Sequence, residues 1–411
     1  MLAAFSLAGM AKEFKTTLTR GVEITYLVNT TDKVARVKLV EEVGVTPPTK
    51  ITIPEKVTYK EGSKSYTLTV IGIGEGALRH TWFTTVNIPS TIRSIGKEAF
   101  YMSSITKIDL PSKLETIGES AFYNSDLAGT VTIPAKCRSI GEHAFSGTYI
   151  STLNVLQGAN PEPLALGDGA FSATDLVSVQ LLRVGSMGEF VFGGCNKLQQ
   201  VDLSGNLSAL PAQTFSSCTS LTRVGLPVVT SIGEWAFHNC VSLREFTFLP
   251  GLQTIGYSAF ESSGLVAVRL KEGFRTLGEE AFFNCPNLKI VELPSTTTSI
   301  GQSAFQHSTN ITTVSCDAAT PPAMKDAAFT YYEGITVWVP AASVEAYRHA
   351  EGWRCFNYDH LDQSGIEAPG VTPEDGEVLL FDLQGNRLND VSSHSGPMIE
   401  VRNGKARKVI R

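Results

Sequence analysis

Apolar residues recur along this chain in one fixed phrase. Aligned on the aromatic residue of an Ala-Phe pair and its equivalents, the phrase repeats twelve times, and successive copies lie 21 to 26 residues apart. The aligned residues are Leu78, Phe100, Phe122, Phe145, Phe171, Phe192, Phe215, Phe237, Phe260, Phe282, Phe305 and Phe329. Because one such unit cannot bury its own apolar face, the repeat predicts a solenoid whose stacked coils share a continuous core.

Each repeat begins with a short alternating segment, such as "ITKIDLP", "LREFTFLP" or "LKIVELP". Apolar residues at its first, fourth and sixth positions leave the fifth on the opposite face, which predicts a short strand ended by the proline. The following "xIGxxAFxxC/S" contains a glycine, which predicts a turn conformation closed to other residues. These glycines are Gly96, Gly118, Gly141, Gly233, Gly256, Gly278 and Gly301. The fold class predicted is a β-rich repeat solenoid of about twelve coils.

The flanking segments lack the repeat. Residues 12–70 contain alternating segments such as "VEITYLV", which predict an N-terminal β-cap on the first coil of the solenoid at 71–360. Residues 361–376 are polar and contain Pro and Gly, as is typical of a linker, and 377–411 predict a small β-tail. Residues 1–11, "MLAAFSLAGMA", favour the remnant of a secretory signal over an ordinary buried terminus.

The repeat phrase "LxxVxLPxxLxxIGxxAFxxC" resembles the BspA-like leucine-rich repeat family of secreted and cell-surface bacterial proteins. The resemblance covers Ile71 to Asp359, and "VWVPAASVEAYRHAEGW" is similar to the family's closing segment, a last strand followed by a short helix. It implies a leucine-rich-repeat solenoid, which convention places in the α/β class. The tail "VLLFDLQGNRLNDVSSHSGPMIEVRNGKARKVIR" is similar to the C-terminal sorting domains of proteins secreted by Gram-negative anaerobes; a plain three-stranded β-module is the alternative.

Composition narrows the classes of partner. The formal net charge is −6, and no block of like charges occurs, so the sequence gives no indication of a nucleic-acid partner. No run approaches the ~20 consecutive apolar residues of a transmembrane helix, so no membrane span is expected.

Seven cysteines, an odd number, argue against a fully paired disulfide framework. Cys195, Cys218, Cys240 and Cys285 each follow an anchor phenylalanine by three residues, and serine fills this position in other coils. This pattern predicts a column of small, buried side chains bonded to neighbouring backbone. The alternative is a metal or redox site, but a column does not converge its ligands on one point. Cys355, in the closing segment, is the one thiol expected to be exposed.

The sequence contains no recognisable catalytic motif. The seven histidines are scattered, without HxH or HExxH spacing, and no nucleophile motif occurs. The segment "GIGEGA" lacks the Lys-Ser/Thr pair of a phosphate-binding loop and reads as the first repeat turn. We therefore expect no enzyme activity, no catalytic residues, no cofactor and no metal.

The outward positions of the repeat strands are the candidate ligand-binding surface. They carry Lys107, Asp109, Asn154, Gln180, Gln200, Asp202, Arg223, Glu245, Arg269, Glu292 and Trp338. Trp338 is the one large aromatic residue among them and is expected to be an exposed anchor. The alternative is a hydrophilic face that binds nothing, because every solenoid needs a soluble outer surface.

The resemblance implies adhesion or ligand binding, with protein ligands such as host extracellular-matrix proteins, or with glycans. It also implies export, so that the chain is secreted, attached to the cell surface or associated with the outer membrane. Two alternatives stay open: an envelope scaffold without an external ligand, and an accessory module of a glycan-processing system.

Overall fold

The computed structural model describes residues 12–19, 21–43, 48–159, 162–205 and 207–358, and the backbones of three strands in the tail. The chain divides into two compact units, Met1–Phe356 and Asn357–Arg411. In the second unit, β27 (Val378–Phe381), β28 (Pro397–Arg402) and β29 (Lys405–Ile410) form an antiparallel sheet. The segments 1–11 and 361–376, interpreted above as a signal remnant and a linker, lie outside the described residues.

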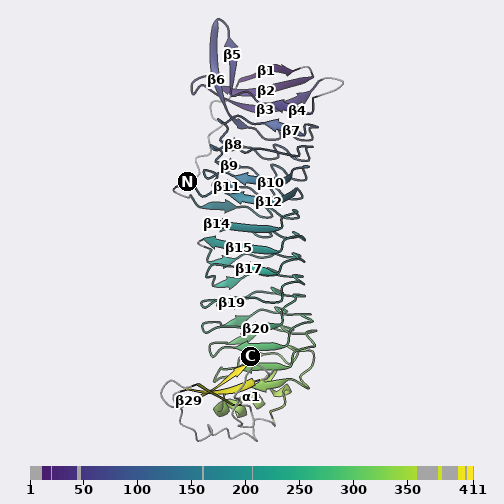
Figure 1. Cartoon of the computed structure of the whole chain (residues 1–411), viewed down its shortest axis with the longest axis vertical. Coiled ribbons are helices and arrows are strands. Elements are labelled where there is room, and N and C mark those ends of the chain that lie inside the picture. Colours follow the sequence, from purple (N-terminus) through teal and green to yellow (C-terminus); the bar gives the residue numbers. More distant parts are fainter. Residues whose placement is uncertain are drawn as a thin grey trace. The chain divides into compact units, whose positions relative to one another are not determined.

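The first unit begins with a β-cap. Strands β1 (Lys12–Thr19), β2 (Val22–Asn29) and β3 (Val34–Glu42) form an antiparallel meander, and β5 (Lys56–Glu61) forms a hairpin with β6 (Lys64–Ile73). Strand β3 pairs in parallel with β6, and β6 pairs with β8 (Ser94–Ile95) of the first coils (Figure 1). Backbone pairing therefore continues from the cap into the coils.

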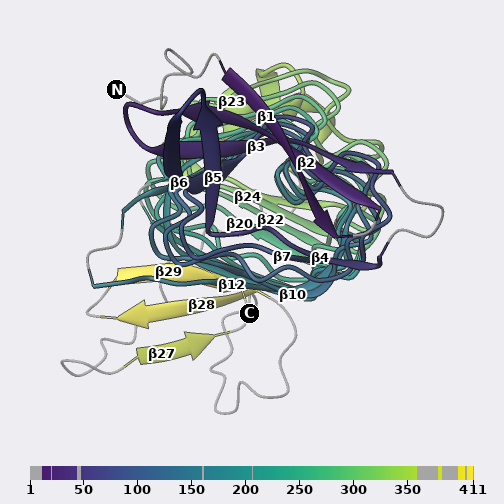
Figure 2. The same cartoon turned by 90° about the horizontal axis from the view of Figure 1, so that it is seen from above.

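One side of the coils carries a ladder of parallel strands, here called the strand ribbon. Its members are β4 (Lys50–Thr52), β7 (Thr85–Asn87), β10 (Ala128–Ile133), β12 (Tyr149–Val155), β14 (Ser178–Met187), β15 (Gln200–Gly205), β17 (Arg223–Gly225), β20 (Ala267–Arg269), β22 (Ile290–Leu293), β24 (Thr313–Cys316) and β26 (Thr336–Trp338). Figure 2 shows β20, β22 and β24 following one side of the coil.

Two of the predicted ribbon strands do not form. The segment "ITKIDLP" contributes only a single bridge, Lys107 to Thr85, and "LREFTFLP" contains no strand. In the second case Phe246 stands where Val224 and Val268 stand in the neighbouring coils, and its ring packs edge-on against Phe237 and Phe260. A phenylalanine ring is larger than a valine side chain, so the backbone at Phe246 does not stay in hydrogen-bonding register with the neighbouring coils. The ribbon is interrupted between β17 and β20.

A second ladder, which the sequence did not lead us to expect, lies on another side of the coils. Its strands are short and include the apolar residue before the repeat glycine, or before Pro211 and Lys325, which replace that glycine in two coils: β8, β9 (Thr116–Ile117), β11 (Ser139–Ile140), β13 (Leu164–Leu166), β16 (Ala209–Leu210), β18 (Ser231–Ile232), β19 (Thr254–Ile255), β21 (Thr276–Leu277), β23 (Ser299–Ile300) and β25 (Ala323–Met324). Strand β14 is long enough to pair in both ladders.

The core is built on the anchor phenylalanines. From Phe100 to Phe329, each ring stacks on the next with centroids 4.8 to 5.9 Å apart and planes within 22° of parallel. The backbone N–H of Phe100 donates to the carbonyl of Ala121 in the next coil, 2.7 Å away. The predicted solenoid fold is confirmed, with about eleven turns between the twelve anchors.

The prediction for the repeat glycines was wrong. None of the seven has a positive φ; the left-handed residues are instead non-glycine ones two positions before the anchor, such as Glu98 and Ser120, with φ of 52° and 51°. The glycines are required by close stacking, because a Cβ on Gly118 would lie 2.6 Å from the carbonyl carbon of Gly96. Even one methyl group would push two coils apart.

The closing segment ends the solenoid as the sequence predicted. After β26 come η1 (Ala341–Ser343), α1 (Val344–His349) and η2 (Trp353–Cys355). Tyr347 donates from its hydroxyl to the carbonyl of Ala318, and Trp353 Nε1 donates to that of Pro322, both at 2.8 Å. Both side chains are fully buried, so the segment covers the core of the last coil.

Candidate ligand-binding surface

The strand ribbon presents alternate side chains away from the core. In β22, Val291 and Leu293 are buried while Ile290 and Glu292 face outward. The pairing register continues this order from coil to coil, since Glu292 pairs with Ser315 of β24 and Ser315 with Trp338 of β26.

The residues singled out in the sequence occupy three stretches of this surface. Asn154 lies in β12, Gln180 in β14, Gln200 and Asp202 in β15, Arg223 in β17, Arg269 in β20, Glu292 in β22 and Trp338 in β26. Lys107 and Asp109 lie in the coil with a single bridge, and Glu245 lies in the interruption between β17 and β20. The structure thus brings together neighbours within each stretch but not the whole set.

Four of these side chains are engaged with one another. Arg269 Nε lies 3.2 Å from Glu292 Oε1, and Gln180 Nε2 donates to Asp202 Oδ2 at 3.5 Å.

Four other charges on the ribbon are available to a ligand. Within the described part of the chain, no ion pair joins the exposed side chains of Lys107, Asp109, Arg223 and Glu245 to an opposite charge. These are therefore the charges that a ligand would meet uncompensated.

Trp338 is half-buried, not exposed as the sequence suggested. It sits in β26, the last strand of the ribbon, paired in register with Ser315. Any contact that a ligand makes with this residue would involve part of the indole only.

The cysteine column has a structural explanation. The thiols of Cys195, Cys218, Cys240 and Cys285 are buried, and each donates to the carbonyl of a phenylalanine in the preceding coil. Burial raises the pKa of all four thiols, to about 11 for Cys285, so they stay protonated donors. Ser308 makes the same bond to Phe282 at 2.7 Å, which explains why serine also fits this position.

Cys355 is the exposed cysteine, as predicted. Its Sγ lies 3.8 Å from Asp326 Oδ1, and Asp326 is itself held by Arg354 and by the N–H of Gly352. Burial and the neighbouring carboxylate raise the pKa of this thiol, which is the opposite of what a nucleophilic cysteine requires. The cluster therefore joins η2 to the last coil and has no activated group.

In the residues that the structure describes, no group of three or more His, Cys, Asp or Glu side chains could hold a metal ion. In that same part of the chain, no helix is long and apolar enough to cross a lipid bilayer.

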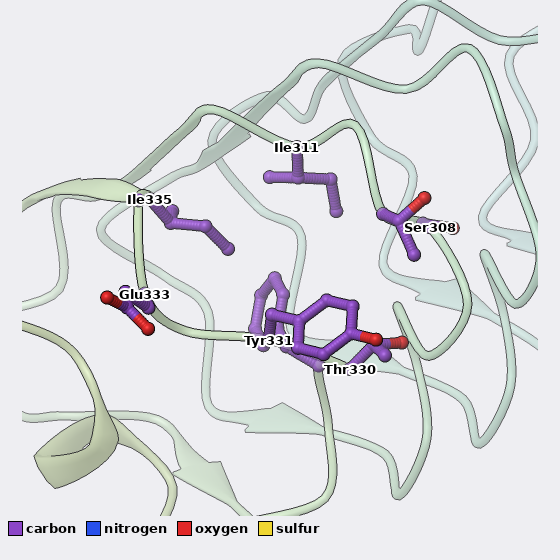
Figure 3. A pocket seen from close by; sticks show the side chains of 9 residues that line it. Ser308, Ile311, Thr330, Tyr331, Glu333 and Ile335 are labelled. Atoms are coloured by element: carbon purple, nitrogen blue, oxygen red, sulfur yellow. The ribbon is translucent and has the colours of Figure 1, made fainter.

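The structure contains a cavity that the sequence did not lead us to expect. A cavity of about 270 Å³ opens between the last two coils, beside Phe329 (Figure 3). The signal that could have revealed it is Tyr332, which occupies the position of a small Cys, Ser or Thr in the other coils.

Comparisons with known proteins agree with this architecture. A family model described as the BspA type leucine rich repeat region matches residues 49–161, 162–228 and 226–336, in six copies. A leucine-rich repeat protein from Bacteroides ovatus ATCC 8483 is 23% identical, with a TM-score of 0.59 over 78% of this chain and 76% of its own. The pneumococcal vaccine antigen PcpA is 19% identical, with a TM-score of 0.50 over 80% of this chain and 94% of its own. At these identities the two structures establish a shared fold alone. A search of curated proteins returned no match.

Proposed function

The chain belongs to the BspA-type leucine-rich repeat family, and from this premise we propose that it is an exported, non-catalytic binding protein that acts at the cell surface or after secretion. Proteins of this family are typically secreted or attached to the cell surface and are generally not enzymes. The proposed ligand is a protein, such as a host extracellular-matrix protein, or a glycan.

The observation that carries this proposal is the chemistry of the ribbon between β10 and β17. Besides Leu182, Asp202 and Arg223, its outward side chains carry hydroxyls and amides: Thr130, Thr132, Thr152, Asn154, Ser178, Gln180 and Gln200. Such groups both donate and accept hydrogen bonds, so they suit the peptide groups of a protein or the hydroxyls of a sugar. Strands about 4.8 Å apart repeat these groups regularly, which favours an extended ligand held by many weak contacts.

Uncompensated charges border this surface. Lys107 and Asp109 lie on one side, and Arg223 and Glu245 lie on the other, at the interruption of the ribbon. Charges of this kind set the register and the encounter rate of a ligand more than its affinity. The proposed mechanism is thus distributed contact, without a cofactor or metal.

A binding array of matrix proteins and bacterial glycans tests the proposal. The full chain is compared with a ribbon variant carrying Asn154→Ala, Gln180→Ala and Gln200→Ala, and with a control carrying Asn196→Ala, Gln253→Ala and Gln302→Ala, which removes the same residue types at exposed positions outside the ribbon. We expect the ribbon variant to bind about tenfold or more weakly and the control to bind like the wild type.

Two results would contradict this function. If the wild type binds nothing on the array, an envelope scaffold without a ligand becomes the better account. If instead a glycan is turned over, the chain belongs with a glycan-processing system. Equal loss of binding in both triple variants would indicate that the ligand contacts a surface other than the ribbon.

A further inference from the structure

The cavity beside Phe329 results from one departure from the repeat. Tyr332 stands three residues after this anchor, where the other coils have Cys, Ser or Thr, and it is too large for a buried position in the column. Its ring turns to pack against Phe329 and Phe356, and its hydroxyl donates to the carbonyl of Asp326 at 2.6 Å. The space that a regular coil would fill is therefore left open.

The backbone ladder between coils also changes beside the cavity. In the preceding coil the N–H of Asn284 donates to the carbonyl of Gln306, 2.8 Å away, as part of a regular ladder. The next equivalent group, the N–H of His307, bonds instead to the side-chain hydroxyl of Thr330. Beyond this point Gly334, with φ of 81°, turns the chain back towards β26.

Three apolar side chains line one part of the cavity, and Thr309 and Thr330 line another part. The apolar residues are Ile311, Phe329 and Ile335, and Figure 3 shows the two isoleucines pointing into the hollow opposite the ring of Tyr331. Ser308 also lines the cavity, but its hydroxyl already donates to the carbonyl of Phe282 and accepts from the N–H of Cys285. The apolar side chains thus offer contact area to a ligand, and the hydroxyl of Ser308 is already engaged within the protein.

The rim carries one aromatic ring and one negative charge. Tyr331 is 65% exposed, and Glu333 lines the same opening. Two cations, Lys325 directly after β25 and Arg354 in η2, are engaged elsewhere, Lys325 with Glu351 and Arg354 with Asp326. Among the described residues, Glu333 forms no ion pair, so its charge is uncompensated.

We propose that this cavity binds a small amphipathic cation, namely a primary ammonium group on an apolar stem, as in a lysine side chain. The stem would lie against Ile311 and Ile335, and the ammonium group would meet the Glu333 carboxylate beside the Tyr331 ring, where cation–π attraction adds to the charge pair. A volume of about 270 Å³ is large enough to admit a lysine side chain. This site is independent of the strand ribbon.

Saturation-transfer NMR on the full chain tests the assignment. The probes are N-acetyl-lysine methylamide, its neutral isostere N-acetyl-norleucine methylamide, and free pentylamine. We expect the lysine probe to bind with a Kd on the order of 1 mM, and norleucine to bind about tenfold more weakly. Binding of pentylamine as tight as that of the lysine probe identifies a free amine as the ligand, and tighter binding of the lysine probe identifies a peptide-borne lysine.

Two variants check that Glu333 is the partner. Glu333→Gln keeps the shape of the rim and is expected to weaken the binding of the lysine probe about five- to tenfold. Glu279→Gln changes an exposed glutamate on another coil and should leave the affinity for the lysine probe unchanged. Both variants change surface residues, and an unaltered Tm verifies that each is folded. The proposal is overturned if no amine binds, if norleucine matches lysine, or if the two variants have equal effects.

Discussion

The thiol of Cys218 donates a hydrogen bond to the carbonyl oxygen of Phe192, 3.1 Å away in the preceding coil. The same oxygen accepts the N–H of Cys195 within its own coil. Both lone pairs of a fully buried carbonyl are thus used. The need for a short side chain with a donor is the physical reason that this position takes Cys, Ser or Thr and not an apolar residue of similar size.

Replacement of Cys218 tests this relationship. Cys218→Ser keeps a donor and is expected to cost less than about 1 kcal/mol of unfolding free energy, whereas Cys218→Val removes the donor and adds volume, costing about 2 kcal/mol. The shift of the urea midpoint for the two variants measures the difference. Equal midpoints for Ser and Val would mean that the hydrogen bond contributes nothing.

The repeat glycines give a second test. Gly118→Ala places a methyl group 2.6 Å from backbone atoms of the neighbouring coil and should cost about 3 kcal/mol or more. Gly129 has φ of 74° and nothing within 4 Å of a built Cβ, so Gly129→Ala should cost only the conformational strain, about 1 kcal/mol. Thermal denaturation of both variants ranks them. If Gly129→Ala lowered the stability more than Gly118→Ala did, backbone conformation and not close stacking would explain why the repeat has a glycine.

Thiol accessibility provides a third test. In the folded chain one cysteine, Cys355, should react with a thiol reagent, and all seven should react after unfolding. Because the carboxylate of Asp326 contributes to the raised pKa of Cys355, Asp326→Asn should lower that pKa and increase the rate near pH 7.5. A rate that is unchanged, or that falls, would exclude this electrostatic coupling; Glu279→Gln serves as the control.

The interruption of the ribbon has a dynamic consequence. Amide groups of residues 243–249 belong to no strand, whereas those of β22 pair on both sides with β20 and β24. Hydrogen exchange followed by mass spectrometry should therefore be faster in 243–249 than in β22. Equal protection of the two segments would show that the backbone at Phe246 is bonded into the ladder in solution.

The repeat carried most of the fold information. The twelve anchors, the capping strands, the closing helix and the buried cysteine column all follow from residue types at fixed spacing, because stacked coils make each position of the phrase contact its own equivalent. The candidate surface was predictable to the same extent: alternation fixes which residues face outward, but not whether anything binds them.

The sequence by itself thus determined the coil, its period and its inward residues, since these depend on local alternation and on like residues meeting between neighbouring units. Only the tertiary structure decided what depends on the distance between coils. It showed that Gly118 is needed for contact with Gly96 rather than for its dihedral angles, that Phe246 breaks the ribbon, and that Tyr332 opens a cavity beside Phe329. Each of these is a mismatch in size between one residue and the coil next to it, which no pattern within a single repeat contains.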